Sequence, residues 1–389
     1  MTAPSPRVLV VHNAYLQRGG EDAVVEAEAD LLQQHGHEVL LYRRDNADIS
    51  QASKGALLAE IFWSRRTMRD LDSIVVNFAP SLVHVHNIFP LISPSLYWAA
   101  SRHRLPVVQT LHNFRLLCPQ AMLLREGRVC EDCLGRLPWR GVVRRCYRDS
   151  LAQSSALAGM LGMHRALGTW QRKVTRYIAL NEFCRAKFIA GGLPENRISV
   201  KPNFVDVARD ESEIRRGGLF VGRLSPEKGI AVLSDALARV PGLTIKVIGE
   251  GPLASSLTEK TGLTLHGAQS QAAVLVAMCR AAYLVMPSIW YENFPRTLVE
   301  AFACGLPVIA SRLGAMTELI EEGHTGLLFT PGDADDLAAK IAWAEQHPDA
   351  MRAMGENARR AYEATYTPEI NYRQLMAIYG QATAEVAHG

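Results

Sequence analysis

Short apolar runs alternate with longer amphipathic stretches along most of this 389-residue chain. In the first half, helical spacing such as that of Glu21–His35 separates runs rich in β-branched residues. These runs lie at Arg7–Val11, Glu38–Tyr42, Leu82–His86, Val107–Leu111, Tyr177–Leu180 and Ile198–Lys201. Short apolar strands that alternate with helices are typical of βαβ units with a parallel sheet.

The second half repeats this pattern. The expected strands are Gly218–Val221, Thr244–Ile248, Leu263–His266, Tyr283–Met286, Pro307–Ala310 and Gly326–Phe329. The expected helices are Gly229–Val240, Ala272–Ala281, Pro295–Ala303 and Asp333–Gln346. Two parallel α/β domains in tandem follow from the repetition.

The length supports the same division, because a chain of this size exceeds one ordinary hydrophobic core. Pro202-Asn203 breaks the pattern between the halves. We therefore predict an N-terminal domain at 1–203 and a C-terminal domain at 204–367. A last helix is expected at Pro368–Ala384, where Pro is favourable at a first helical position.

Charge is shared unevenly between the halves. Residues 1–203 hold 26 Lys and Arg against 17 Asp and Glu, whereas residues 204–389 hold 16 against 22. A basic first half favours an anionic partner, such as a membrane surface or a phosphate-bearing acceptor, although drift in Arg usage explains it equally well. No apolar run is long enough to span a membrane, and no signal peptide is evident, so we expect a cytoplasmic protein.

Two glutamates eight residues apart mark the segment Glu292–Ala310. Glu292 follows the Tyr283–Met286 strand, and ligands of parallel sheets bind at the carboxyl ends of strands. Glu300 lies two helical turns further on and can accept hydrogen bonds from a ribose hydroxyl pair. The alternative is a capped surface helix with two solvated carboxylates.

The helix between these glutamates begins at Pro295. Its first backbone N–H groups, around Thr297 and Leu298, have no partner inside the helix and can face a phosphate.

The complete string closely resembles the Glu-x7-Glu signature of retaining glycosyltransferases of the GT-B fold, in family four. In this chain the string opens with Glu292-Asn293-Phe294-Pro295-Arg296-Thr297-Leu298-Val299-Glu300. The resemblance implies that Glu292 contacts the transferred sugar and Glu300 the ribose, with Asn293 and Phe294 beside the donor. It also implies two Rossmann-like, doubly wound domains that face a cleft, with a C-terminal helix at 368–389 that crosses back to the first domain.

A second string, Gly222-Arg223-Leu224-Ser225-Pro226-Glu227-Lys228-Gly229, follows the first strand of the second domain. Two cations beside a helix start make a diphosphate site that needs no metal. The string resembles the family's Gly-Arg-Leu-x-x-x-Lys-Gly element, which implies that Arg223 and Lys228 neutralise the leaving pyrophosphate. Gly249 opens a Gly-x-Gly-Pro turn that resembles another family element, although a structural turn is a comparable explanation.

The first domain offers Gly19-Gly20 after its first strand, where glycines let the backbone approach a phosphate. The family carries a Gly-Gly loop here, but usually followed by Ala rather than by Glu21. At the carboxyl end of a later strand, a histidine in the position of His112 lies beside the reacting sugar in the family. His86 is expected on the same edge with less weight, and a structural histidine is the alternative for each.

Four of the seven cysteines crowd into one Arg-rich segment. They are Cys118, Cys130, Cys133 and Cys146. A C-x2-C pair between two single cysteines is a pattern that binds structural zinc, and reduced core thiols or a redox-labile pair are the alternatives. A subset of the family shares the string His112–Pro119, which implies a common inserted loop near the acceptor.

The resemblance implies a hexosyl or other glycosyltransferase that uses a UDP or GDP sugar as substrate. We expect retention of configuration, no catalytic metal or other cofactor, and a saccharide or lipid-linked saccharide acceptor in polysaccharide or glycolipid assembly. Peripheral contact with the inner face of the membrane is compatible with the basic first domain, and no nucleic acid is expected. Two alternatives stay open: a sugar-nucleotide epimerase of the same fold, and a zinc-stabilised protein that binds nucleic acid or lipid.

Overall fold

A computed structural model describes residues 6–16, 19–51, 53–207, 215–257 and 262–388. The chain divides into two compact units. The first comprises Met1–Met122, Glu131–Pro202 and Asn371–Gly389, and the second comprises Leu123–Cys130 and Asn203–Ile370. The division between Pro202 and Asn203 coincides with the predicted break in the pattern. The segment Leu123–Cys130 departs from the predicted limits of the first domain because it leaves the parallel sheet and forms a separate hairpin.

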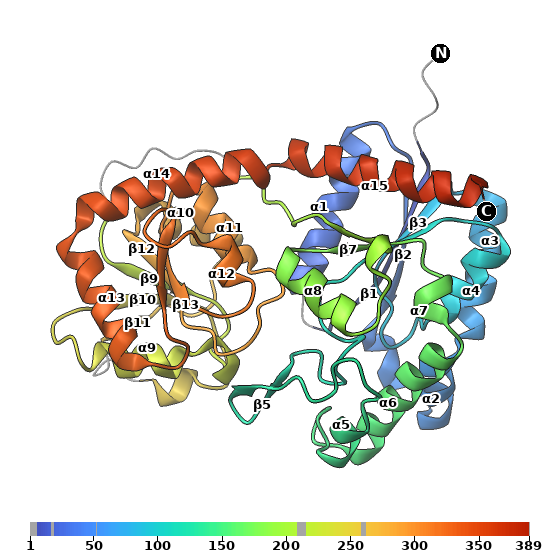
Figure 1. Ribbon diagram of the computed structural model, residues 1–389, viewed down its shortest axis with the longest axis horizontal. Helices are drawn as coiled ribbons and strands as arrows, with labels where there is room; N and C mark the ends of the chain where they lie inside the picture. Colours follow the sequence, from blue (N-terminus) through green and yellow to red (C-terminus); the bar gives the residue numbers. More distant parts are fainter. Residues whose placement is uncertain (1–5, 17–18, 52, 208–214, 258–261, 389) are drawn as a thin grey trace. The chain divides into compact units, whose positions relative to one another are not determined.

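The first unit is built on a six-stranded parallel sheet in the order β2-β1-β3-β4-β7-β8 (Figure 1). Its strands are β1 (Val8–Ala14), β2 (Val39–Asp45), β3 (Leu82–Asn87), β4 (Val107–Thr110), β7 (Arg176–Ala179) and β8 (Ile198–Val200). All six were predicted. Its helices are α1 (Gly20–Gln34), α2 (Lys54–Phe62), α3 (Arg65–Phe78), α4 (Ser95–Arg102), α5 (Trp139–Val143), α6 (Leu151–Ala166), α7 (Thr169–Arg172) and α8 (Glu182–Ala190). The apolar runs form buried strands. Every residue of β1 and of β3, for example, is buried.

The cysteine-bearing segment contributes little regular structure. It contains the two-residue strands β5 (Leu124–Arg125) and β6 (Arg128–Val129), which pair antiparallel. Strands this short carry no apolar alternation, which is why the sequence pattern did not reveal them.

The second unit repeats the doubly wound plan in the order β11-β10-β9-β12-β13-β14. Its strands are β9 (Gly218–Val221), β10 (Ile245–Ile248), β11 (Leu263–Leu265), β12 (Tyr283–Met286), β13 (Val308–Ser311) and β14 (Gly326–Phe329), and all were predicted. Its helices are α9 (Ile230–Leu237), α10 (Gln271–Arg280), α11 (Arg296–Ala303), α12 (Met316–Leu319), α13 (Ala334–Gln346) and α14 (Pro348–Thr365). The prediction missed two of these helices, the four-residue α12 and the longer α14, whose sequence is rich in charged residues.

The last helix, α15 (Pro368–His388), returns to the first unit, as predicted. Its apolar residues Leu375, Ile378, Tyr379 and Ala382 join the core formed by β1, α1, β3, β4 and β7. None of the helices in the described ranges combines the length and the apolar character that a membrane crossing requires.

Each sheet contains one point where the strand order reverses. In the first unit it lies between β1 and β3, and in the second unit between β9 and β12. Ligands of open α/β sheets bind at such a point, outside the carboxyl ends of the strands. These two edges are therefore where functional side chains are expected.

Candidate functional site

At the switch point of the second unit, the structure brings two predicted residues into direct contact. Lys228 follows β9 and Glu292 follows β12, and Lys228 Nζ lies 2.7 Å from Glu292 Oε1. The Glu292 side chain is 7% exposed and that of Lys228 is 27% exposed. A lysine that remains partly open to solvent beside a buried carboxylate is able to meet an anionic ligand.

The turn that carries Lys228 requires a glycine at position 229. Gly229 has φ +69°, and a Cβ there would lie 1.8 Å from the carbonyl oxygen of Pro287. The backbone of the β9 loop thus packs directly against the end of β12, and Ile289 N donates to Glu227 O at 3.0 Å. This close packing sets the distance between Lys228 and Glu292.

Two further donors orient the Glu292 carboxylate. Ser288 Oγ and Trp290 Nε1 lie 2.8 Å and 3.0 Å from Glu292 Oε1. Lys228 Nζ also lies 5.6 Å from the centroid of the Trp290 ring, within the range of a cation–π contact. Neither Ser288 nor Trp290 was predicted, although both belong to the loop that the motif identified.

Glu300 is buried on α11 with its own partners. Its Oε1 accepts from Arg296 Nε at 2.8 Å and from Gln271 Nε2 at 2.8 Å. Burial raises the pKa of Glu300, and the Arg296 charge and these two hydrogen bonds lower it in part. The sequence motif contains Arg296 but gives no sign of Gln271, which comes from α10.

The start of α11 corrects one expectation. Leu298 N donates to Pro295 O at 2.9 Å, so this amide already has a backbone partner and is not open toward a phosphate. Thr297, which precedes it, is half-buried and stays a prediction. Asn293 is buried, and the ring of Phe294 lies 6.2 Å from that of Tyr366, so Phe294 takes part in the core of this unit.

Two predicted donor-side residues remain, Arg223, which is exposed, and Gly249, which is packed against another loop. Arg223 is exposed, and none of the described residues forms an ion pair with it, so it is available to a ligand. Gly249 has φ +146°, and a Cβ there would lie 1.9 Å from the carbonyl oxygen of Gly222. Backbone packing between two loops therefore explains Gly249, and its contact with a donor stays a prediction.

In the first unit, His112 is half-buried and hydrogen-bonded to His86. The His112 Nε2 and His86 Nδ1 atoms are 2.8 Å apart, and the rings stack at 5.1 Å. Burial lowers the pKa of His86 to about 4, and the neighbouring His84 lowers it further. Burial also lowers the pKa of His112 well below its usual range, and the neighbouring His86 adds to this effect. Both rings are therefore neutral near pH 7.

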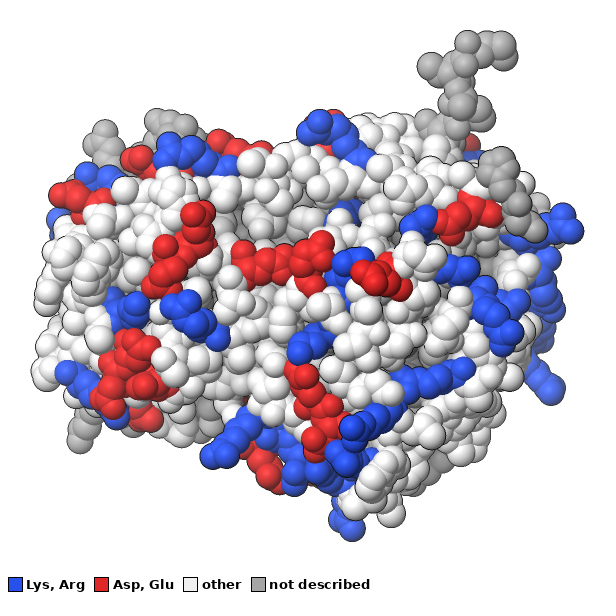
Figure 2. All heavy atoms as spheres, viewed as in Figure 1, with Lys and Arg blue, Asp and Glu red and all other residues white. Residues whose placement is uncertain are grey.

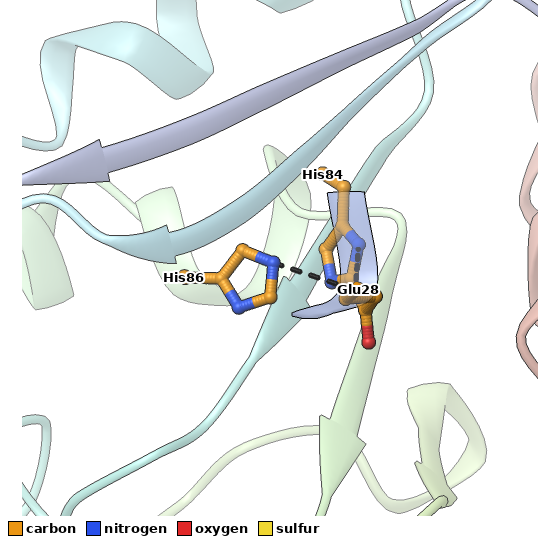
Figure 3. Close-up of side chains that lie close together, drawn as sticks. All are labelled: Glu28, His84 and His86. Carbon is orange, nitrogen blue, oxygen red and sulfur yellow. Dashed lines mark ion pairs between the residues drawn. The ribbon is translucent and has the colours of Figure 1, made fainter. Parts of the chain in front are cut away.

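A buried carboxylate lies behind these rings. His84 Nδ1 and His86 Nε2 lie 2.9 Å and 3.4 Å from Glu28 Oε1, as the dashed lines in Figure 3 show. The other oxygen, Oε2, pairs with Lys201 Nζ at 3.0 Å. Burial acts to raise the pKa of Glu28, but the charges of Lys201 and His84 and the histidine hydrogen bonds hold it well below the usual range.

Glu28, His84 and His86 form the one group in the described ranges whose three ligand atoms are close enough to share a metal ion. Lys201 already supplies a cation to the same carboxylate, and His84 Nε2 lies 2.8 Å from Thr110 Oγ1. The group is thus balanced in charge as a hydrogen-bonded network. No motif pointed to Glu28 or Lys201, because their contact joins positions 173 residues apart.

The Gly19-Gly20 loop is followed directly by Glu21, which carries a carboxyl group. Neither glycine has a positive φ, and an added Cβ would meet nothing closer than 3.7 Å, so the local fold does not itself require glycine there. Glu21 Oε2 accepts from Tyr15 Oη at 2.9 Å and from Asn113 Nδ2 at 3.4 Å, whereas Oε1 is buried without a partner in the described chain. Burial raises the pKa of Glu21 to about 7, which the Tyr15 and Asn113 hydrogen bonds partly offset.

The four clustered cysteines are buried or half-buried. Their Sγ atoms do not form a group of three within 4.8 Å anywhere in the described ranges. Cys118, Cys133 and Cys146 belong to the first unit, whereas Cys130 ends the hairpin segment grouped with the second. The zinc site stays a prediction, which elemental analysis of the purified protein will test.

Comparisons with known proteins identify the family of the chain. Residues 18–209 match the family described as Glycosyltransferase Family 4, and residues 211–361 match that described as Glycosyl transferases group 1. D-inositol 3-phosphate glycosyltransferase of Mycobacterium marinum is 31% identical over 426 residues, covering 98% of this chain and 86% of that relative. An uncharacterised glycosyltransferase of Methanocaldococcus jannaschii is 33% identical over 187 residues, or 45% of this chain, and the chain spans about half, 52%, of its length.

Among solved structures, Anabaena HepE in complex with UDP superposes with a TM-score of 0.68 at 19% identity, covering 95% of this chain and 98% of that one. At that identity the likeness establishes the fold. Together with the sequence matches, it shows that the chain belongs to the GT-B glycosyltransferases, with a Family 4 domain followed by a group 1 domain.

Proposed function

We propose that this glycosyltransferase transfers a sugar from a UDP or GDP sugar to an acceptor hydroxyl with retention of configuration, in polysaccharide or glycolipid assembly. The observation that carries the proposal is the Lys228–Glu292 pair at the switch point of the second unit. Anabaena HepE, which has the same fold, was solved in complex with UDP, and this supports a nucleoside diphosphate as a ligand of this chain.

Two cationic side chains and two carboxylates hold the donor. Lys228 and Arg223 contact the diphosphate, Glu292 accepts hydrogen bonds from hydroxyls of the transferred sugar, and Glu300 accepts from the ribose. When the diphosphate binds, the Lys228 ammonium interacts with two anionic groups at once, a phosphate of the ligand and the Glu292 carboxylate. Fixed cations in a partly desolvated site stabilise the charge that grows on a leaving diphosphate.

The reaction breaks the bond between the anomeric carbon and the diphosphate oxygen. The acceptor oxygen forms its bond to the same face of that carbon, and its proton passes to the departing diphosphate. The two cations then stabilise the leaving group without a catalytic metal, while the enzyme contributes positioning.

For the acceptor we propose a saccharide, or a saccharide linked to a lipid, at the basic first unit. Leu137, Trp139 and Val143 are 58%, 60% and 69% exposed around α5. The same segment of the sequence contains five arginines, at Arg136, Arg140, Arg144, Arg145 and Arg148. Figure 2 shows Lys and Arg gathered at the lower edge of the molecule, where Figure 1 labels α5 and α6. Exposed Trp with Arg suits an anionic membrane surface, so co-sedimentation with anionic vesicles is expected to fall in Trp139→Ala.

A thermal-shift screen of nucleotide sugars tests the proposal, because a ligand that binds the folded state raises its melting temperature. We expect one UDP or GDP sugar to stabilise the protein, and the anomeric configuration of the product to match that of this donor. Failure of every nucleoside diphosphate and nucleotide sugar to bind would overturn the proposal, and an inverted product would overturn retention.

A further inference from the structure

The network behind His112 specifies which nitrogen of that ring carries a proton. Lys201 lies at one end of this network, and its ammonium lies 3.0 Å from Glu28 Oε2 and 3.1 Å from Asn371 Oδ1. Lys201 is fully buried and Glu28 is 1% exposed. A buried carboxylate paired with a lysine is ionised, and an ionised carboxylate only accepts hydrogen bonds.

Because Glu28 only accepts, the histidine nitrogens that face it must donate. His84 Nδ1 lies 2.9 Å from Glu28 Oε1 and 2.7 Å from the Tyr379 hydroxyl oxygen, both of which can accept its proton. The Nε2 atom of His84 then accepts from the Thr110 hydroxyl at 2.8 Å. His86 Nε2 lies 3.4 Å from Glu28 Oε1, and neither of these two buried atoms has a closer hydrogen-bond partner of good geometry among the described residues. A proton on His86 Nε2 is attracted by the anionic Glu28 carboxylate at this distance, whereas a lone pair there would be repelled by it.

His112 is the next ring of the network after His86. A neutral His86 with its proton on Nε2 has a lone pair on Nδ1, so His112 Nε2, 2.8 Å away, must donate to it. The second nitrogen of His112, Nδ1, then carries a lone pair and has no partner among the described residues. The low pKa values of both rings agree with neutral histidines near pH 7.

We propose that Glu28 and His86 are positioning residues that hold His112 with its proton on Nε2, so that Nδ1 accepts a hydrogen bond from a hydroxyl of the bound sugar. The inference rests on the proposed function for the identity of that ligand. A partner that fixes the tautomer and orientation of a histidine removes part of the ordering that a substrate would otherwise have to impose.

Nitrogen-15 NMR of histidine-labelled protein at pH 7, without substrate, tests the tautomer directly. The His112 signals are assigned by comparison with His112→Asn. We expect a protonated Nε2 and an unprotonated Nδ1 in the wild type, and a mixture of both tautomers in His86→Phe. His164→Asn is the matched control, because it removes another buried histidine that bonds Thr169 and Phe62 instead, and it should leave His112 unchanged.

Steady-state kinetics separate positioning from a purely structural role. In His86→Phe we expect kcat to fall between about tenfold and a hundredfold with the KM for the donor unchanged, as misplacement of a reacting group predicts. His112 with its proton on Nδ1 in the wild type would overturn the proposal, as would an unchanged kcat in His86→Phe.

Zinc titration provides a further decisive result. Stoichiometric zinc bound at Glu28, His84 and His86 would replace the proton on His86 Nε2 and overturn the proposal. If His86→Phe does not fold, the wild-type tautomer decides alone. Because that spectrum is recorded without substrate, a protein with the expected tautomer but no transferase activity would refute the proposed function and leave the tautomer assignment standing.

Discussion

The two units of this molecule hold charged residues in contrasting ways. In the second unit, Lys228 and Glu292 come from loops adjoining β9 and β12, and Lys228 is 27% exposed. In the first unit, Glu28 and Lys201 are buried in the core, 2% and 0% exposed at their side chains, and histidines connect them to His112. In the partly exposed pair, Lys228 can contact a ligand as well as Glu292. The buried pair instead holds the neighbouring side chains in place.

The comparison first predicts different consequences for stability. Lys201→Met leaves the Glu28 carboxylate buried without its cation and should lower the free energy of unfolding by about 3–5 kcal/mol. Urea denaturation measures this. The double variant Glu28→Gln with Lys201→Met should recover most of the loss. Arg352→Met, which removes an exposed pair with Asp349 at 3.5 Å, is the control and should change stability by less than about 1 kcal/mol. Equal losses for Lys201→Met and Arg352→Met would contradict a special role for burial.

Lys228→Ala should affect catalysis instead. We expect the rate of sugar transfer to fall by about two to three orders of magnitude, since a cation that stabilises the leaving diphosphate is lost. Lys246→Ala, an exposed lysine on β10, should transfer at the wild-type rate. Wild-type turnover in a folded Lys228→Ala protein would refute the diphosphate role.

Glu21 sharpens the comparison, because its carboxyl is buried but has no cation in ion-pair contact among the described residues. Its pKa rises from 4.5 to about 7 on folding, so the stabilisation is full below pH 4.5 and is lost as the pH rises through 7. The free energy of unfolding of the wild type, relative to Glu21→Gln, should therefore fall by about 3 kcal/mol across that window. Urea denaturation at several pH values measures this difference. If the free energy of unfolding changed with pH in the same way for the wild type and Glu21→Gln, the result would contradict the burial of Glu21.

Gly229 allows steric contact to be separated from backbone strain. Gly229→Ala and Gly36→Ala both place alanine at a positive φ, +69° and +82°, but only Gly229 meets a neighbour, the Pro287 carbonyl. We expect Gly36→Ala to cost about 1–2 kcal/mol and Gly229→Ala about 1–3 kcal/mol more. Transfer should also drop in Gly229→Ala because Lys228 moves. Equal melting temperatures would show that the β9 loop is not packed as described.

The sequence predicted the sheets well because buried parallel strands are short apolar runs, and all twelve were recognisable. Contiguous motifs also singled out Lys228, Glu292 and Glu300, and the structure brings Lys228 and Glu292 into contact, whereas their roles toward a donor stay predictions. The sequence did not predict Gln271, Glu28 or Lys201, whose roles arise from contacts between distant segments. Leu298 shows a different limit, because a motif identifies a helix start but does not reveal that its amide is already paired with Pro295.

Calorimetric titration of nucleoside diphosphates tests the central claim, that the second unit holds the donor through Lys228, Glu292 and Glu300. UDP or GDP should bind the wild type, bind Lys228→Ala and Glu300→Gln at least about tenfold more weakly, and bind His112→Asn with unchanged affinity. Equal affinity for the wild type and Lys228→Ala, or no binding of either nucleotide to the wild type, would contradict the account.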